Sequence, residues 1–128
     1  MTILDTHAWV WWVNGGQKLS RSAKAAIRSA NALGVSVISV WEVALLVCKG
    51  RLRLSKTTDV WVDEALSVVP HISLLPLTPK IAITGASLRN NLNDPADCIL
   101  VATALDLGCA FVSADERIGR SGLVRVVW

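Results

Sequence analysis

Two aspartates open an apolar helix in the stretch NDPADCILVATAL, residues 93–105. Asp94 fits the N-cap position, and Pro95 is suited to the first helical position that follows. Asp97 then falls in the first turn, where the positive end of the helix dipole favours a carboxylate. A helix start accounts fully for Asp94. It leaves Asp97 open to a second interpretation, in which its carboxylate takes part in chemistry.

Three further acids stand at comparable places. Asp5 ends the apolar run TIL, Glu42 lies two residues beyond VSVISV, and Asp115 follows AFVSA. Each has a structural interpretation of its own, since Asp5 and Asp115 can cap a helix and Ser39 with Glu42 matches a capping box. In a parallel sheet, however, ligands bind beyond the carboxyl ends of the strands. We therefore predict that one pocket holds four acids, Asp5, Glu42, Asp97 and Asp115.

Four carboxylates in one pocket repel one another. Two such charges about 4 Å apart repel by roughly 4 kcal/mol at an effective dielectric constant near 20. Mg²⁺ or Mn²⁺ can offset this repulsion, because both cations take oxygen ligands and also bind phosphate. Without a cation, the acids are expected to raise one another's pKa values. The pattern favours a divalent metal site.

Other catalytic motifs are missing. The chain has no GxxxxGK[ST], GxGxxG or GxSxG sequence for nucleotide binding or acyl transfer. Asp5-Thr6-His7 lacks the second aspartate that aspartyl-phosphate phosphatases use as an acid. Three cysteines without a CxxC pair and two distant histidines disfavour a disulfide framework and a zinc site.

The elements that must position the acids alternate along the chain. Short apolar runs predict strands at residues 2–5, 35–40, 71–77, 110–114 and 123–128. Amphipathic or capped segments predict helices at residues 20–33, 41–50, 57–69, 78–88 and 95–108. This alternation predicts an α/β fold with a mostly parallel sheet. A length of 128 residues fits one domain, residues 1–128.

Composition narrows the class of protein further. The mean hydropathy is +0.47, yet no apolar run approaches the roughly 20 residues of a membrane span. The first residues lack the basic region of a signal peptide, so we expect a cytoplasmic protein without membrane contact. A formal net charge of +3 mildly favours anionic partners such as nucleic acid.

The chain resembles PIN-domain ribonucleases and, within them, the VapC toxins of bacterial toxin–antitoxin pairs. The matching stretches are ILDTHAWVWW, SVWEVALLVCKGRLRL, LLPLTPKIA, DPADCILVATAL and FVSADERI, in the family's order and spacing. The resemblance implies a three-layer α/β/α sandwich and an acidic pocket that holds one or two Mg²⁺ or Mn²⁺ ions and hydrolyses RNA phosphodiester bonds. The family's metal-site acids fall on Asp5, Glu42, Asp97 and Asp115.

The resemblance also implies partners and supporting residues. It implies a tRNA or rRNA substrate, a cognate VapB-like antitoxin, a homodimer, and DNA contact only through the antitoxin. Asp94 keeps its capping role, and Thr6 and Ser113 are expected to orient carboxylates or waters. Asn93 and Cys98 stand where relatives often carry basic residues, which affects RNA affinity or substrate choice.

Basic and aromatic residues are candidates for contacts with RNA or protein. The basic candidates for RNA binding are Lys49, Arg51, Arg53, Lys56, Arg117 and Arg120. Trp9, Trp11 and Trp12 cannot all face one core from a single helix, so we expect part of AWVWWV to serve a homodimer or an antitoxin, with base stacking as the alternative. Trp41, Trp61 and Trp128 are expected in the core or at its edge.

Two other functions remain as alternatives. A non-catalytic PIN-like module that binds RNA or protein would be free to lose some of the four acids, so their presence argues against it. A signalling receiver also has an acidic pocket, but the chain lacks the lysine expected after a late strand.

Overall fold

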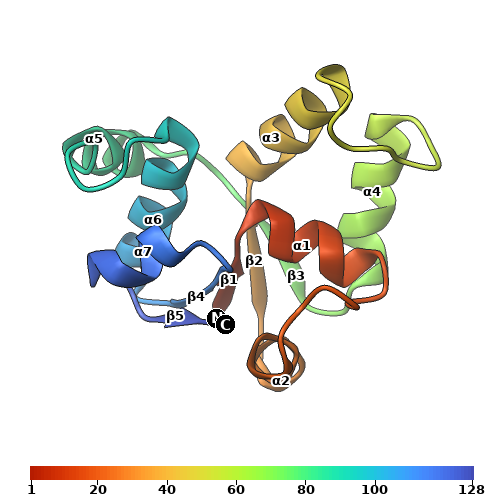
Figure 1. The fold of residues 1–128 in the computed structure, drawn as a ribbon, viewed down its shortest axis with the longest axis horizontal. Helices are drawn as coiled ribbons and strands as arrows, with labels where there is room; N and C mark the ends of the chain where they lie inside the picture. Colours follow the sequence, from red (N-terminus) through yellow and green to blue (C-terminus); the bar gives the residue numbers. More distant parts are fainter.

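Five short parallel strands form one sheet, in the order β3-β2-β1-β4-β5, in the computed structural model of residues 1–128 (Figure 1). The strands are β1 (Thr2–Leu4), β2 (Leu33–Ser36), β3 (Ile72–Leu75), β4 (Ala110–Val112) and β5 (Val126–Val127). Every neighbouring pair is parallel. The predicted α/β fold is confirmed, and the sheet expected to be mostly parallel is entirely so.

Helices cover both faces of the sheet (Figure 1). Leu4 and Val112 belong to one core cluster, and their neighbours Ile3 and Phe111 belong to the other. This division follows from the alternation of side chains along a strand. The first cluster packs under α1 (Thr6–Val13), α2 (Arg21–Ser29), α3 (Val37–Cys48) and α4 (Thr58–Val68). The second packs under α5 (Pro79–Ser87), α6 (Pro95–Leu107) and α7 (Glu116–Ser121).

The predicted strand at residues 35–40 is wrong in its second half. Strand β2 ends at Ser36, and α3 begins at Val37, four residues before the predicted helix start at residue 41. The Ser36 side chain caps α3 by accepting a hydrogen bond from the Ile38 amide, at 3.2 Å. The misreading has a clear cause, because a short apolar run without periodicity does not distinguish a buried strand from a buried helix.

Three other segments differ from the predictions, two in their boundaries and one in its burial. The helix expected over residues 20–33 ends at Ser29, because Leu33 already pairs with β1 and β3. Strand β3 is an edge strand with partly exposed residues, not a strand buried on both faces. The last strand covers only Val126 and Val127. None of these changes moves an acid away from the carboxyl end of the sheet.

The helix starts that contain acids agree with the local sequence. Asp94 caps α6 by accepting hydrogen bonds from the amides of Ala96 and Asp97, and Gly108 ends the helix in the left-handed conformation.

No helix in the structure is long and apolar enough to cross a membrane.

Candidate active site

One pocket of about 380 Å³ contains all four of the predicted metal-site acids. It opens beyond the carboxyl ends of β1 and β4, the place where ligands bind in open parallel sheets. The residues that line it are Asp5, His7, Trp11, Glu42, Asp94, Asp97, Ala114, Asp115 and Arg117. The strands thus bring together carboxylates from four separate parts of the chain.

Asp5 both caps a helix and faces the pocket. Its Oδ1 accepts a hydrogen bond from the Thr6 amide at 2.7 Å, which starts α1. Its Oδ2 accepts a hydrogen bond from the hydroxyl of Ser113, the residue that follows β4, at 2.7 Å. Because the side chain is buried and held at both oxygens, Asp5 is fixed in one orientation.

The buried hydroxyl of Thr6, a residue expected to orient carboxylates, holds Glu42, and the buried hydroxyl of Ser39 contacts Thr6 in turn. Thr6 Oγ1 donates to Glu42 Oε1 at 2.6 Å and lies 2.9 Å from the Ser39 hydroxyl oxygen. A hydroxyl has a single proton to donate, so Ser39 donates to Thr6 when Thr6 donates to Glu42. The predicted capping box of Ser39 and Glu42 is wrong, because both residues lie inside α3 and Ser36 is its cap.

Asp97 lies in the first turn of α6, with its side chain 16% exposed. Asp94 lines the same pocket and is exposed, while its Oδ1 bonds the amides of Ala96 and Asp97. Asp94 therefore keeps its capping role, and Asp97 has no backbone amide that requires its carboxylate. Its side chain is left free to serve the pocket.

Asp115 is paired with an arginine that sequence analysis assigned only to RNA binding. Its side chain caps α7, and the Arg117 guanidinium donates to it, with Nη2 2.9 Å from Asp115 Oδ2. The same Nη2 atom lies 3.8 Å from Asp97 Oδ2. The Ser113 hydroxyl accepts from the Asp115 amide at 3.0 Å, so it links Asp115 to Asp5. Arg117 is the one cation that lines the acidic pocket.

The pKa values show where negative charge is least stable. The pKa of Asp97 is raised to about 7, chiefly by burial and in addition by repulsion from the other acids of the pocket. Burial also raises the pKa of Asp5 and of Glu42, and repulsion from neighbouring acids adds to both. Asp115 departs from the expectation of mutual repulsion, because the hydrogen bond from Arg117 lowers its pKa.

The donor set suits a hard divalent cation, but the side chains do not form a finished metal site. Carboxylate oxygens are preferred ligands of Mg²⁺ and Mn²⁺. Burial has raised the pKa values of three of the carboxyl groups, those of Asp5, Glu42 and Asp97. No cluster of three or more acidic, histidine or cysteine side chains is arranged to hold an ion as it stands. Arg117 and the helix starts at Asp5, Asp94 and Asp115 supply part of the compensating charge.

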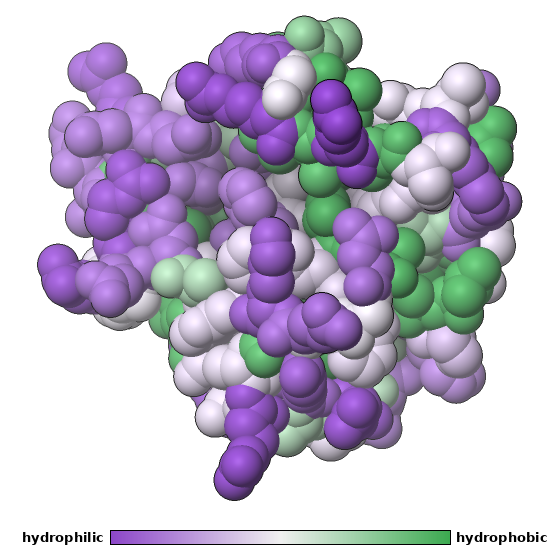
Figure 2. Space-filling model, turned by 45° about the vertical axis from the view of Figure 1, so that its right-hand side comes forward, coloured by the Kyte–Doolittle hydropathy of each residue, from purple (hydrophilic) through white to green (hydrophobic).

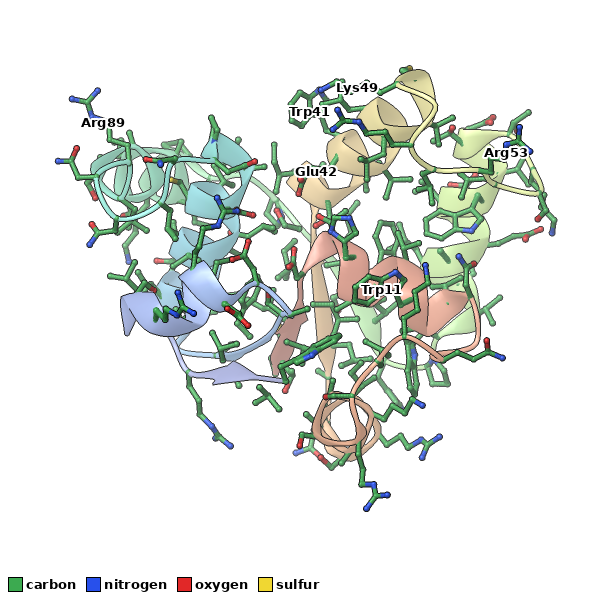
Figure 3. The ribbon with its side chains drawn as sticks, in the orientation of Figure 1. Trp11, Trp41, Glu42, Lys49, Arg53 and Arg89 are labelled. Atoms are coloured by element: carbon green, nitrogen blue, oxygen red, sulfur yellow. The ribbon has the colours of Figure 1, made fainter.

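The six basic candidates for RNA binding are not gathered in one place. Arg117 lines the pocket, whereas Arg120 pairs with Glu116 at 2.9 Å on the exposed side of α7. Lys56 pairs with Glu64. Figure 3 places Lys49 at the far end of α3 and Arg53 on the loop toward α4, and Arg51 lies between them in sequence.

The tryptophans divide between core, pocket and surface. Trp9 is fully buried and meets Trp61 edge to face, with ring centroids 5.1 Å apart. Trp11 lines the acidic pocket, and Trp128 lies beside it. The expectation that Trp41 packs in or beside the core is wrong, because its side chain is 55% exposed on α3.

A larger hollow, of about 450 Å³, lies away from the acids. Ten residues line it, seven of them hydrophobic, and none is acidic; Trp12, Ile27 and Val69 are among them. It contains no carboxylate, and Arg28 and His71 are its only charged or titratable side chains. The acidic pocket is therefore the candidate active site.

Comparison with known proteins gives a consistent result. The model of the PIN domain family matches residues 2–122. Ribonuclease VapC22 of Mycobacterium tuberculosis is 33% identical over 117 residues, which cover 91% of this chain and 88% of VapC22.

Solved structures share the fold. The VapC20 toxin of Mycobacterium tuberculosis, described as cleaving the sarcin–ricin loop, superposes with a TM-score of 0.71 at 16% identity, covering 98% of each chain. The DNA-bound VapBC complex of Salmonella typhimurium gives a TM-score of 0.69 at 17% identity, covering 98% of this chain and 95% of the other. At these identities the likeness concerns the fold.

Proposed function

The chain belongs to the PIN-domain family and is homologous to VapC ribonuclease toxins, and from its acidic pocket we propose that it is a metal-dependent endoribonuclease, the toxin of a toxin–antitoxin pair. The observation that carries this proposal is the gathering of four carboxylates, from four separate parts of the chain, at the carboxyl end of one sheet. Repulsion among them is a cost that a bound cation would relieve.

We assign one or two Mg²⁺ or Mn²⁺ ions to Asp5, Glu42, Asp97 and Asp115. These residues would hold the cation, which would lower the pKa of a bound water toward neutrality and polarise the phosphate. The protein supplies the alignment: Ser113 fixes Asp5, and Thr6 together with Ser39 fixes Glu42. No protein nucleophile is required, and the products would carry a 5′-phosphate and a 3′-hydroxyl.

Arg117 is expected to compete with the cation. Its guanidinium contacts Asp115 and approaches Asp97, so a cation shared by these two acids must displace it. Replacing Arg117 with glutamine should therefore tighten Mn²⁺ binding, measured by calorimetry without RNA. Weaker Mn²⁺ binding by the Arg117→Gln protein would contradict this competition.

The substrate we propose is RNA, with tRNA or rRNA as targets. Arg117, once released from the acids, lies beside the pocket where it can contact phosphate. Lys49, Arg51, Arg53, Lys56 and Arg120 lie outside the pocket lining and could contact only more distant parts of a long RNA. Asn93 and Cys98 add no positive charge near the acids, which fits a site that depends on the cation to bind the scissile phosphate.

The proposed partners are a VapB-like antitoxin and a second copy of the chain, with DNA contacted only through the antitoxin. The similar structure from Salmonella typhimurium contains a VapBC complex bound to DNA. An RNA target and such an antitoxin would place the activity in the cytoplasm. Co-expression with the neighbouring antitoxin gene should restore growth, and light scattering should give twice the monomer mass. Unrelieved toxicity would contradict the first pairing, and a strict monomer the second.

The proposed activity is tested with purified protein, cellular RNA and either Mn²⁺ or a chelator. Cleavage should require the metal. Asp97→Asn should lower it by about a hundredfold or more, since even residues that only orient metal ligands contribute 10- to 100-fold. Asp63→Asn is the matched control, because Asp63 is an exposed aspartate on α4 outside the pocket.

Two outcomes would overturn the proposal. Cleavage that persists in chelator would exclude the metal mechanism. RNA binding without cleavage by the wild-type protein would favour the non-catalytic module instead. If the wild-type protein cleaves RNA only with metal, mapping the cleaved ends on total RNA after brief induction would identify the target.

A further inference from the structure

Three aromatic side chains lie close together at one side of the acidic pocket, and two of them line it. His7 and Trp11 stand one turn apart on α1, and both line the pocket. Their ring centroids are 5.6 Å apart, and the Trp128 ring centroid lies 5.8 Å from that of Trp11. We call His7, Trp11 and Trp128 the aromatic shelf. Figure 3 shows Trp11 on α1, across the opening from the start of α3, which carries Glu42.

Trp11 packs partly against the core, but the shelf is not buried in it. In the same helix Trp9 is fully buried against Trp61, so α1 already directs one large aromatic inward. His7 is exposed, Trp11 is half-buried, and Trp128 is 39% exposed. Three rings in a row therefore stay accessible to a ligand that enters the pocket.

A cation lies against the same shelf. The Lys18 ammonium nitrogen is 5.9 Å from the centre of the Trp11 ring, and Lys18 is exposed and forms no ion pair. In Figure 2 hydrophobic residues gather toward the right and the top, and hydrophilic ones cover most of the left. The shelf combines aromatic faces, a cation and acids suited to a metal-bound phosphate.

We propose that the aromatic shelf stacks an unpaired RNA base next to the phosphate that is cleaved, so that the enzyme selects single-stranded segments. This inference rests on the proposed ribonuclease function and specifies its substrate. Every base has a face that can stack on an aromatic ring, whereas in a duplex both faces are covered by neighbouring bases. Lys18 then contacts the phosphate that follows the stacked base. A partner protein is the alternative occupant, because its basic side chains could pair with the adjoining acids.

Binding is measured by fluorescence anisotropy with a short labelled single-stranded oligoribonucleotide in millimolar Mn²⁺. All proteins carry Asp97→Asn, so that the RNA stays intact. Trp11→Leu should weaken binding about tenfold, the value expected for one stacked base, and Trp11→Phe should recover most of the loss. Trp41→Leu is the matched control and should bind like the parent, since Trp41 is an exposed tryptophan outside the pocket.

An abasic scan identifies the stacked base. Replacing that single nucleotide with an abasic one should weaken binding by the parent about tenfold and leave binding by the Trp11→Leu protein unchanged, because the two changes remove the same contact. The same sequence as a duplex should bind more weakly and should not respond to Trp11→Leu. Trp128→Leu gives a second variant at the edge of the shelf, and it should weaken binding in the same direction.

The outcomes separate this inference from the proposed function. Equal binding by the parent and the Trp11→Leu protein, with wild-type cleavage intact, would overturn the shelf alone. A loss of antitoxin binding but not of RNA binding on Trp11→Leu would assign the shelf to a protein partner. Absence of metal-dependent cleavage by the wild-type protein would overturn the proposed function itself.

Discussion

Replacing Asp97 with asparagine should stabilise the metal-free protein at alkaline pH while it abolishes catalysis. The pKa of Asp97 is about 7 in the folded chain, compared with 3.8 for an unperturbed aspartate, chiefly because of burial. Keeping this side chain ionised above pH 7 thus costs the folded state up to about 4 kcal/mol. Because the side chain is 16% exposed and the neighbouring acids adjust their protonation, we expect about half of that.

The direction of the pH dependence follows from proton binding. Between about pH 4 and pH 7 the folded chain retains a proton on Asp97 that the unfolded chain has lost, so the wild-type protein loses stability as the pH rises through this range. Below pH 4 both states are protonated and this contribution is absent. The asparagine variant has no such proton. Its advantage over the wild type should therefore be greatest near pH 8 and vanish near pH 4.

The assay is thermal unfolding of both proteins in chelator across this pH range. A gain of about 2 kcal/mol corresponds to roughly 10 °C in Tm near pH 8 for a chain of this size. In millimolar Mn²⁺ the order should reverse, since a cation at a hundredfold excess over its Kd stabilises the wild type by about 2.7 kcal/mol and the variant by much less. Asp63→Asn serves as the control and should show neither effect.

Three results would refute this reasoning. Equal melting temperatures of wild type and Asp97→Asn at pH 8 in chelator would mean that Asp97 does not carry the electrostatic cost of the pocket. A difference that persists unchanged at pH 4 would mean that the asparagine acts by packing or capping. Equal responses of the two proteins to Mn²⁺ would place any metal site elsewhere.

Three further predictions concern alignment and packing. Asp94→Ala should destabilise the protein by about 1 kcal/mol in urea unfolding, and Asp94→Asn by much less, because only asparagine still caps α6; equal losses would exclude the cap. Thr6→Val removes the hydroxyl that bonds Glu42, so it should lower the rate of RNA cleavage and destabilise the fold by about 2 kcal/mol. Thr6→Ser keeps that hydroxyl and should change both quantities little; cleavage kinetics and melting curves of the two variants measure the difference. Gly34→Ala should cost at least about 1 kcal/mol, because a new Cβ would lie 2.6 Å from Leu75 Cδ1. That cost should shrink in a Leu75→Ala background, and an unchanged cost would refute the clash.

Sequence patterns determined the features that depend on near neighbours. Asp94 before Pro95 and Gly108 after the last apolar turn define α6, because capping bonds join residues two or three positions apart. The alternation of strands and helices determined the parallel sheet. Once the sheet is parallel, acids that follow the strands must meet at one edge, so the set of four acids could be predicted without coordinates.

Tertiary structure alone decided the contacts between distant positions and the fate of ambiguous segments. The bond from Ser113 to Asp5 spans 108 positions, and Ser39 acts on Thr6 across 33, so no local pattern encodes either contact. The run VSVISV divided between β2 and α3 because Ser36 caps a helix at that point, although β-branched residues by themselves favour a strand. Arg117 contacts the acids because their negative charges, which only the fold brings together, attract its guanidinium. The positions of Trp11 and Trp41 were decided by packing, because a helix buries the side that meets the core.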